Sequence, residues 1–528
     1  MDNINELPVE LLGHIFSFLS LRDRKNANAV CTLWHNVLHG VRFQRQCKVS
    51  LNRNFNDDLN DLEKCVLRCF RNIHINFWYE TDFEENDQPE IDDIIQFKYL
   101  YDPTPEHHLI QLLFGLNLDL ECLELSISFE SCREILENRL SQIINLRELS
   151  LNFETKENIT AKQYSTTWII EHHHIEKLTI DLPCAYLPFK VIAPNLTSLD
   201  LPSNCRRGYQ LIETYCRQLQ CLKVTIQDED TVDDIMSLSF PCLTHLQTRP
   251  YDDNDKEMEV RYARTRNKYV DVEKEEQFVI RMPKLRCFES ENHLMFFRIG
   301  TALSKFAKQL IEVTLENQDM DLGQIKAFEA IPIKVLSMQR CKIRTPSQTL
   351  PTLNMPHLNS LVLRFNESDI VFNNGLSELK SLKLTLSSRS RNHKVLHKIC
   401  HNLLNLEYLE IWTYNVLVNT GFRYLHKLTK LRTLKIFACQ TKTPFWSHCS
   451  VMPTLRRVVF KECNLNTSTF QQVAKVFPGL KELILDECCV KFNDMNSGKS
   501  TSDMDSERCN FLLQQLKEFF PMCTISLS

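Results

Sequence analysis

Residues 406–412 read LEYLEIW, and residues 431–437 read LRTLKIF. Both stretches place leucine or isoleucine at positions one, four and six, with polar residues at most of the positions between them. Apolar residues that alternate with polar ones are typical of a short strand with one buried face. Because the two stretches begin 25 residues apart, they predict the same strand in two successive structural repeats.

The same hexamer recurs along most of the chain. Successive hexamers begin 21 to 29 residues apart, which is the period of leucine-rich repeats, and one step is longer, at 42 residues. The predicted fold class is therefore α/β: a leucine-rich-repeat solenoid with a curved parallel sheet on its concave face and helices and turns outside. Hexamer residues four and six should point inward, whereas residues three, five and seven should face the concave surface. The hexamers begin at Leu120, Leu146, Ile175, Leu196, Leu219, Leu243, Leu285, Leu310, Ile333, Leu358, Leu379, Leu406, Leu431, Leu455 and Leu480.

Breaks in this period indicate the domain boundaries. The solenoid is predicted to cover residues 65–528, with an early strand near Phe70 and a last strand near Met522, and a linker helix region is expected at 47–64. The 42-residue step contains a charged stretch that should be an exposed loop or a strand pair. Insertions are expected near 80–93, 249–281 and 491–508.

The ninth position of the repeat carries side chains that should turn inward beneath each strand. Four of them are cysteines in different repeats, and an intracellular protein is expected to keep them as free thiols. The residues at this position are Asn204, Asn366, Cys341, Cys439, Cys463 and Cys488.

Composition excludes several function classes. The 62 basic and 67 acidic residues give a formal net charge of -5, so neither a nucleic acid nor an anionic membrane is an expected partner. Only 10 glycines are present, and no phosphate-binding loop, dinucleotide or hydrolase template matches. The first ten residues lack the basic region of a signal peptide, and no run of 18 apolar residues could span a bilayer. Together with 21 cysteines in a long chain, these features favour a reduced protein of the cytoplasm, the nucleus or both.

The stretch ELPVELLGHIFSFLSLRDRKNANAVCTLWHNVL, residues 6–38, predicts three short helices with more apolar side chains than they can cover among themselves. The uncovered apolar side chains predict that a partner helix or an adjoining module packs against these helices. Residues 1–46 resemble the F-box, whose L-P-x-E motif and V-C-x-x-W motif stand here at the usual spacing. The matching residues are Leu7, Pro8, Glu10, Leu11, Leu12, Ile15, Phe16, Leu19, Asp23, Val30, Cys31 and Trp34.

An F-box followed by leucine-rich repeats resembles the substrate receptors of SCF-type cullin-RING ubiquitin ligases. The resemblance implies a receptor without catalytic residues, metal or cofactor, which docks on the Skp adaptor and through it on the cullin and RING subunits. The repeats would hold a protein for ubiquitination and proteasomal degradation. The adaptor-binding residues implied are Leu7, Pro8, Leu11, Leu12, Ile15, Phe16, Leu19, Val30, Cys31 and Trp34.

A candidate surface for the substrate follows from the concave positions. Trp412 and Phe437 share the seventh slot of adjacent repeats, so the two rings should form one aromatic platform. Basic residues should surround it and favour an acidic or phosphorylated degron, whereas upstream strands present Glu289, Glu291, Glu312 and Glu316. The alternative is an ordinary exposed aromatic pair, or packing of Trp412 against Tyr414. The substrate-binding candidates are Arg364, Lys383, Tyr408, Trp412, Lys435, Phe437 and Lys461.

Histidines and cysteines leave other interpretations open. Cys31, His35 and His39 have helical spacing that could present metal ligands, but no fourth ligand is evident. A second histidine stripe, at 393, 397 and 401, lies near Cys400, and residues 172–174 are most simply a polar loop. With 21 cysteines and 17 histidines, a chance Cys-His pair carries little weight as a nucleophile.

Two further function classes compete with the receptor. One is an interaction scaffold outside ubiquitination, in which the N-terminal helices only cap the solenoid. The other is a secreted repeat protein, which would use the glycosylation sequons at Asn158, Asn195, Asn366 and Asn466. The motif set argues against the first, and the N-terminal sequence argues against the second.

Overall fold

The structure is a computed structural model. It describes residues 4, 7–19, 21–38, 48–52, 72–76, 120–126, 135–136, 140–152, 168–181, 189–202, 206–226, 228–250, 272–344, 352–364, 372–386, 392–413, 422–438, 446, 449–491, 499–500 and 506–527. The chain forms two compact units, Met1–Gln227 and Asp228–Ser528. Among the described residues, no helix has the length and apolar content needed to cross a membrane.

The first unit begins with three short helices and continues with parallel strands. The helices are α1 (Val9–Ser17), α2 (Leu21–Asn28) and α3 (Thr32–Leu38), and a later helix is α9 (Arg206–Tyr215). Two strands, β5 (Trp168–Glu171) and β7 (Phe189–Ile192), pair with each other apart from the main sheet. The main sheet contains β1 (Lys48–Asn52), β2 (Asn72–Asn76), β3 (Cys122–Ser126), β4 (Glu148–Asn152), β6 (Lys177–Asp181), β8 (Ser198–Leu201) and β9 (Cys221–Ile226).

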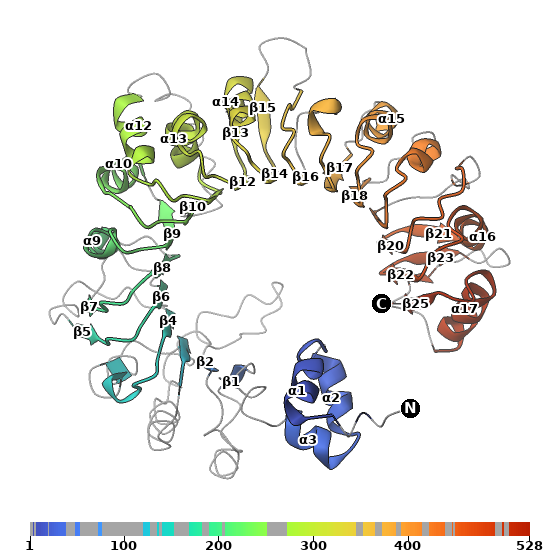
Figure 1. Cartoon of the computed structure of the whole chain (residues 1–528), viewed down its shortest axis with the longest axis horizontal. Helices are drawn as coiled ribbons and strands as arrows, with labels where there is room; N and C mark the ends of the chain where they lie inside the picture. The colour runs from blue at the N-terminus through green and yellow to red at the C-terminus, as the bar shows by residue number, and fades with distance from the viewer. Residues whose placement is uncertain are drawn as a thin grey trace, which may run out of the picture. The chain divides into compact units, whose positions relative to one another are not determined.

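The second unit also consists of parallel strands and helices. Its strands lie on the inner side of a curve and its helices on the outer side (Figure 1). Its helices are α10 (Glu229–Ser237), α12 (Val272–Ile280), α13 (His293–Phe306), α14 (Leu322–Ala327), α15 (Asn392–Asn402), α16 (Thr467–Val476) and α17 (Ser506–Phe519), with a 3-10 helix, η8, at Phe422–Lys427. Its main strands are β10 (His245–Pro250), β11 (Cys287–Ser290), β12 (Glu312–Glu316), β14 (Val335–Gln339), β16 (Ser360–Arg364), β17 (Ser381–Thr385), β18 (Tyr408–Trp412), β19 (Thr433–Phe437), β20 (Arg457–Lys461), β22 (Glu482–Asp486) and β25 (Thr524–Leu527). Short outer strands pair as β13 (Asp319–Asp321) with β15 (Lys342–Arg344) and as β23 (Cys489–Lys491) with β21 (Asn464–Asn466) and β24 (Lys499–Ser500).

Every predicted hexamer corresponds to a strand that begins at its third residue or close to it, so the repeat prediction is confirmed. In β16, for example, exposure alternates along the strand, with Leu361 and Leu363 buried and Ser360, Val362 and Arg364 partly exposed. Parallel strands of one repeat pattern stack in one register, which aligns Thr385, Trp412, Phe437 and Lys461 across β17, β18, β19 and β20. Along each strand, the apolar side chains that alternate with these concave positions point away from the concave face and form the core.

Two boundary predictions are wrong. Residues 48–52 form strand β1, paired in register with β2, where a linker helix region was expected. In the charged insertion, α12 replaces the expected loop or strand pair over 272–280, because Phe278 and Val279 are buried and Glu275 pairs with Arg298 at 2.7 Å. The 80–93 insertion, residues 251–271 and most of 491–508 lie outside the described residues.

Five residues that directly follow strands of the second unit have a left-handed backbone, although none is glycine. In each case the next residue occupies the ninth position of the repeat. The left-handed residue turns the chain so that this next side chain faces inward; Cys341, for example, is fully buried, and its thiol donates to the Leu315 carbonyl at 3.4 Å. The predicted inward direction is confirmed for Cys341, Cys463 and Cys488, while Cys439, Asn204 and Asn366 lie outside the described residues. The left-handed residues are Asn317, Arg340, Ala438, Glu462 and Glu487.

Candidate functional site

The N-terminal helices form a small core of their own. Leu12, Phe16 and Val37 are buried in it, and the rings of Phe16 and Trp34 meet edge to face with 4.9 Å between their centroids. Leu7, Leu19, Leu33 and Leu38 pack around this core and are partly buried.

Arg24 closes the end of helix α1. Its guanidinium donates to the carbonyl oxygens of Phe16, Ser17 and Leu19 at 3.0 to 3.1 Å. The side chain thus adds a donor for carbonyls at and just beyond the helix end, where acceptors are commonly left open; the Phe16 oxygen also accepts from the Leu19 N–H at 3.1 Å. This contact gives Arg24 a local structural role.

Other apolar side chains of the same helices are exposed. Leu11, Ile15 and Phe18 follow one another at helical spacing along α1, and Phe18 is the most exposed of them at 77%. Val9 and Val30 are exposed as well. An apolar row of this kind on a small helical segment is typical of a protein interface.

The structure therefore divides the predicted adaptor-binding residues into three groups. Leu12 and Phe16 lie inside the helical core and do not reach the surface, so their expected role changes from direct contact to support of the exposed row. Leu7, Leu19, Cys31 and Trp34 are partly buried, whereas Pro8, Leu11, Ile15 and Val30 are exposed.

Phe18 and Val9 were not among the predicted adaptor-binding residues. The signal for Phe18 was present in the sequence, because it stands three residues after Ile15 and seven after Leu11 on the same helical face.

The predicted aromatic platform is present on the inner side of the second unit. Trp412 of β18 and Phe437 of β19 are register partners, and their rings stack with 4.1 Å between centroids and 13° between planes. The guanidinium carbon of Arg364 lies 5.6 Å from the centre of the Trp412 ring, which is within the range of a cation-π contact.

A buried carboxylate lies next to this platform. Glu410 is 3% exposed, although it occupies a concave position. It accepts hydrogen bonds from the Tyr408 hydroxyl at 2.7 Å and from the Trp412 indole N–H at 3.0 Å, and it forms an ion pair with Arg364. Burial alone would raise the pKa of Glu410, but the hydrogen bonds from Tyr408, Trp412 and Arg364 outweigh it and hold the pKa below its ordinary value. The charged carboxylate therefore orders three of the predicted substrate-binding residues.

The cations of the predicted basic rim are only partly available. Arg364 is paired with Glu410, and Lys461 lies 3.1 Å from Asp486 and 3.5 Å from Glu487. Lys383 and Lys435 lie over the Tyr408 ring, at 5.8 Å and 5.7 Å from its centre. Phe437 is only 9% exposed, so it supports the Trp412 ring from beneath and the surface presents mainly Trp412 with two lysines nearby. The acidic partners of the other two cations reduce the positive charge of this surface.

The structure changes the interpretation of several histidines and of Cys400. Residues 172–174 form the predicted loop, but within it His172 is buried, and its ring lies 2.8 Å from the Ile143 carbonyl oxygen. The rings of His397 and His401 stack on α15 at 4.0 Å. Cys400 is fully buried, and burial raises the pKa of its thiol to about 12, which argues against a nucleophile. His39 lies outside the described residues, and so does the side chain of His393.

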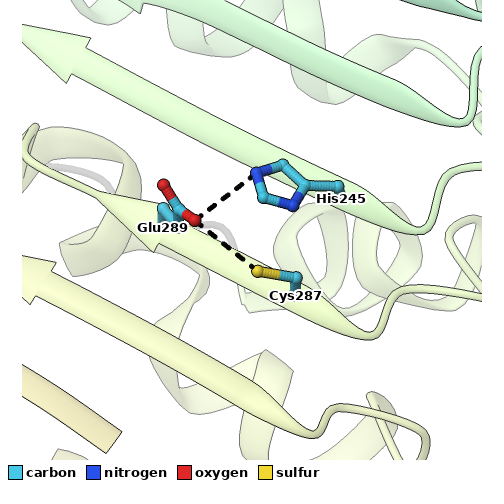
Figure 2. Close-up of side chains that lie close together, drawn as sticks. All are labelled: His245, Cys287 and Glu289. Carbon is cyan, nitrogen blue, oxygen red and sulfur yellow. Dashed lines mark hydrogen bonds and ion pairs between the residues drawn. The ribbon is translucent and has the colours of Figure 1, made fainter. Parts of the chain in front are cut away.

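One cluster of possible metal ligands was not predicted. His245 of β10 and Cys287 of β11 are register partners, and Glu289 follows two residues later on the same face of β11 (Figure 2). Their ligand atoms all lie within 4.8 Å of one another. Both His245 and Cys287 occupy the third hexamer slot, but the 42-residue step between them hid the adjacency in the sequence.

Comparisons with known proteins agree with the two parts of the chain. Residues 4–46 match the F-box-like family. No curated protein matches the chain. Similar solved structures include the TLR13–ssRNA13 complex (17% identity, TM-score 0.40, covering 79% of this chain and 61% of that chain), the mouse RP105/MD-1 complex (13%, 0.36, 79% and 76%) and the plant peptide hormone receptor RGFR1 in complex with RGF2 (10%, 0.29, 71% and 67%).

This chain spans 61% of the length of the TLR13 chain. At these TM-scores the assignment of leucine-rich repeats depends on the strands and register described above. The protein is thus an α/β repeat protein, and it carries an F-box-like segment at residues 4–46, consistent with an F-box and leucine-rich-repeat protein.

Proposed function

We propose that the protein is the substrate-recognition subunit of an SCF-type ubiquitin ligase. The observation that supports this most directly is the exposed row of Leu11, Ile15 and Phe18 within the segment that matches the F-box-like family. This row would dock on the Skp adaptor, which links to the cullin and RING subunits. Burying large apolar side chains of this kind is the usual source of affinity at protein interfaces.

The repeats would then hold the target protein on the inner side of the second unit. The proposed contact surface is the Trp412 ring, which stacks on the largely buried Phe437, is held by Glu410 and has Lys383 and Lys435 nearby. The receptor performs no covalent chemistry. It raises the effective concentration of target lysines near the charged conjugating enzyme and so makes the transfer local. We place this activity in the cytoplasm or nucleus, where reducing conditions maintain thiols.

Adaptor docking is tested with the full chain carrying Ile15→Asp and Phe18→Asp. Both side chains are exposed, so the helical core stays intact while two charges enter the proposed interface. The matched control is Ile144→Asp, which changes an equally apolar side chain, 69% exposed, outside the F-box-like segment. We expect the double variant to bind the Skp adaptor at least about 30-fold more weakly, which corresponds to about 2 kcal/mol, and the control to bind normally.

Co-purification from cells with the adaptor and cullin gives the measurement. Equal recovery of both subunits by the double variant and the control would contradict the receptor and favour the non-ubiquitin scaffold. Circular dichroism of each variant shows that the repeats are still folded.

The substrate surface is tested with Trp412→Ala combined with Phe437→Ala, by proximity labelling in cells with the proteasome inhibited. The control is Phe306→Ala, since Phe306 is an exposed aromatic residue at the end of outer helix α13. We expect a discrete set of labelled proteins to disappear with the double variant alone, while adaptor binding is unchanged. An unchanged set would place the substrate elsewhere on the chain.

A further inference from the structure

The His245, Cys287 and Glu289 cluster has the geometry of a metal site. The distance from His245 Nε2 to Glu289 Oε1 is 3.6 Å, and the distance from Cys287 Sγ to Glu289 Oε1 is 3.7 Å. Zinc bond lengths of about 2.0 to 2.3 Å and tetrahedral angles require ligand atoms roughly 3.4 to 3.6 Å apart. The cluster therefore needs only a few tenths of an ångström of adjustment along the two measured edges.

The two strands keep these ligands in place. Register pairing aligns His245 with Cys287 in neighbouring strands, and strand alternation returns Glu289 to the same face two residues later. Figure 2 shows the three side chains turned toward one another on one side of the sheet. Ligands on paired strands need little ordering when a metal binds, which reduces the entropic cost of the site.

The contacts that exist between these groups are weak ones. At 3.6 Å, the His245 ring and Glu289 are too far apart for a hydrogen bond, and the Nε2 atom is shielded from solvent without a hydrogen-bond partner. A shielded polar atom without a partner costs free energy that a bound ligand would recover. By comparison, Arg298 and Glu275 of the same unit approach to 2.7 Å.

The chemistry of the three donors selects the metal. An imidazole nitrogen, a thiol sulfur and a carboxylate oxygen together suit zinc, whereas magnesium and calcium require oxygen ligands. Three protein ligands leave one tetrahedral position open, which is the arrangement of zinc sites that exchange a ligand. All three residues are partly exposed, so the open position faces the inner surface of the second unit.

We propose that His245, Cys287 and Glu289 bind one Zn²⁺ ion with an open coordination position. On binding, the Cys287 thiol loses its proton to solvent and its sulfur bonds to the metal, with water as the fourth ligand. A histidine, cysteine or carboxylate of a protein lying on this surface would replace that water. The site is separate from the aromatic platform and independent of the proposed ligase role.

The test uses the full chain, purified, stripped with a chelator and titrated with Co²⁺ and then Zn²⁺ alone. We expect one equivalent of Co²⁺ to give tetrahedral visible bands together with a thiolate-to-cobalt charge-transfer band, and Zn²⁺ to displace it. Cys287→Ser should abolish the charge-transfer band, and Glu289→Gln should weaken Zn²⁺ binding at least about 100-fold.

The chain offers a matched control in Cys122, which also begins a strand and is partly exposed, but whose register partners are Asn72 and Glu148. Cys122→Ser should leave the cobalt spectrum and the zinc affinity unchanged. The proposal is overturned if the unaltered chain shows no charge-transfer band, or if Cys287→Ser binds Zn²⁺ as tightly as Cys122→Ser does. Glu289→Gln retains the thiol and the strand, so it keeps the test valid if the serine variant folds poorly.

Discussion

Glu410 and Glu289 occupy the same slot in two repeats of one unit, but their surroundings differ. Glu410 is 3% exposed and has three donors, from Tyr408, Trp412 and Arg364. The side chain of Glu289 is 29% exposed and meets His245 and Cys287 only at 3.6 and 3.7 Å. A carboxylate whose hydrogen bonds are complete holds its neighbours in position, whereas one with incomplete contacts can still bind a ligand.

Phe16 and Phe18 show the same contrast with apolar side chains. Phe16 packs against Trp34 inside the helical core, while Phe18, the residue that caps the C-terminal end of the same helix, is largely exposed. In both pairs the residue type is identical, and the surroundings decide between stability and binding.

The largest expected effect concerns the two phenylalanines. Phe16→Ala should destabilise the N-terminal helices by about 3 to 5 kcal/mol, because it empties a buried site. Phe18→Ala should change their stability by less than about 0.5 kcal/mol but weaken adaptor binding. Hydrogen exchange of residues 9–38 measures the first effect, and a binding titration measures the second. If both variants unfolded these helices equally, the division between core and docking face would be wrong.

The next effect compares the cations beside the two glutamates. Arg364→Ala leaves Glu410 buried without its cation and should lower the free energy of unfolding by about 3 kcal/mol. His245→Ala, with no metal present, should lower it by less than about 0.5 kcal/mol, because Glu289 remains accessible to water. Urea unfolding followed by near-ultraviolet circular dichroism compares them. Equal losses would remove the distinction between the two sites.

A pH series measures how much of the stability contributed by Glu410 depends on its negative charge. Since its folded pKa lies below the ordinary value of 4.5, its contribution is present above that pH and is lost as the pH falls through the folded pKa. Glu410→Gln should therefore cost about 2 kcal/mol at pH 7, and the cost should shrink in acid. A constant cost for Glu410→Gln would mean that its charge is irrelevant.

The smallest effect concerns one hydrogen bond. Trp412→Phe keeps the stack on Phe437 but removes the indole N–H that donates to Glu410 at 3.0 Å. We expect a loss of about 1 kcal/mol in stability, with the tyrosine and arginine contacts preserved. Thermal unfolding of this variant beside Phe306→Ala measures it. A loss as large as that of Arg364→Ala would show that the indole hydrogen bond contributes as much as the ion pair does to holding the carboxylate.

The sequence was sufficient for the strands and for neighbours in one register. The stacking of Trp412 on Phe437 could be predicted because both share the seventh slot of adjacent hexamers, and parallel strands of one pattern pair slot by slot. The same reasoning missed β1, because residues 48–52 have no full hexamer to mark them.

The contacts of long side chains were beyond the pattern. Arg364 reaches Glu410 across an intervening strand, and a slot assignment gives the direction of a side chain but not its length or its choice of partner. The predicted basic rim therefore overestimated the free positive charge. Helix α12 was missed for a related reason, since the pairing of Glu275 with Arg298 allows a highly charged segment to pack against the core.

The inward thiols beneath the strands can report the local opening of individual repeats. Cys341, Cys463 and Cys488 are fully buried in three repeats, and burial raises the pKa of the Cys341 thiol to about 11. An alkylating reagent can reach each sulfur only when its repeat separates from a neighbour. Because repeats open as local units, the rates at which these three cysteines become labelled give the order in which this part of the array comes apart.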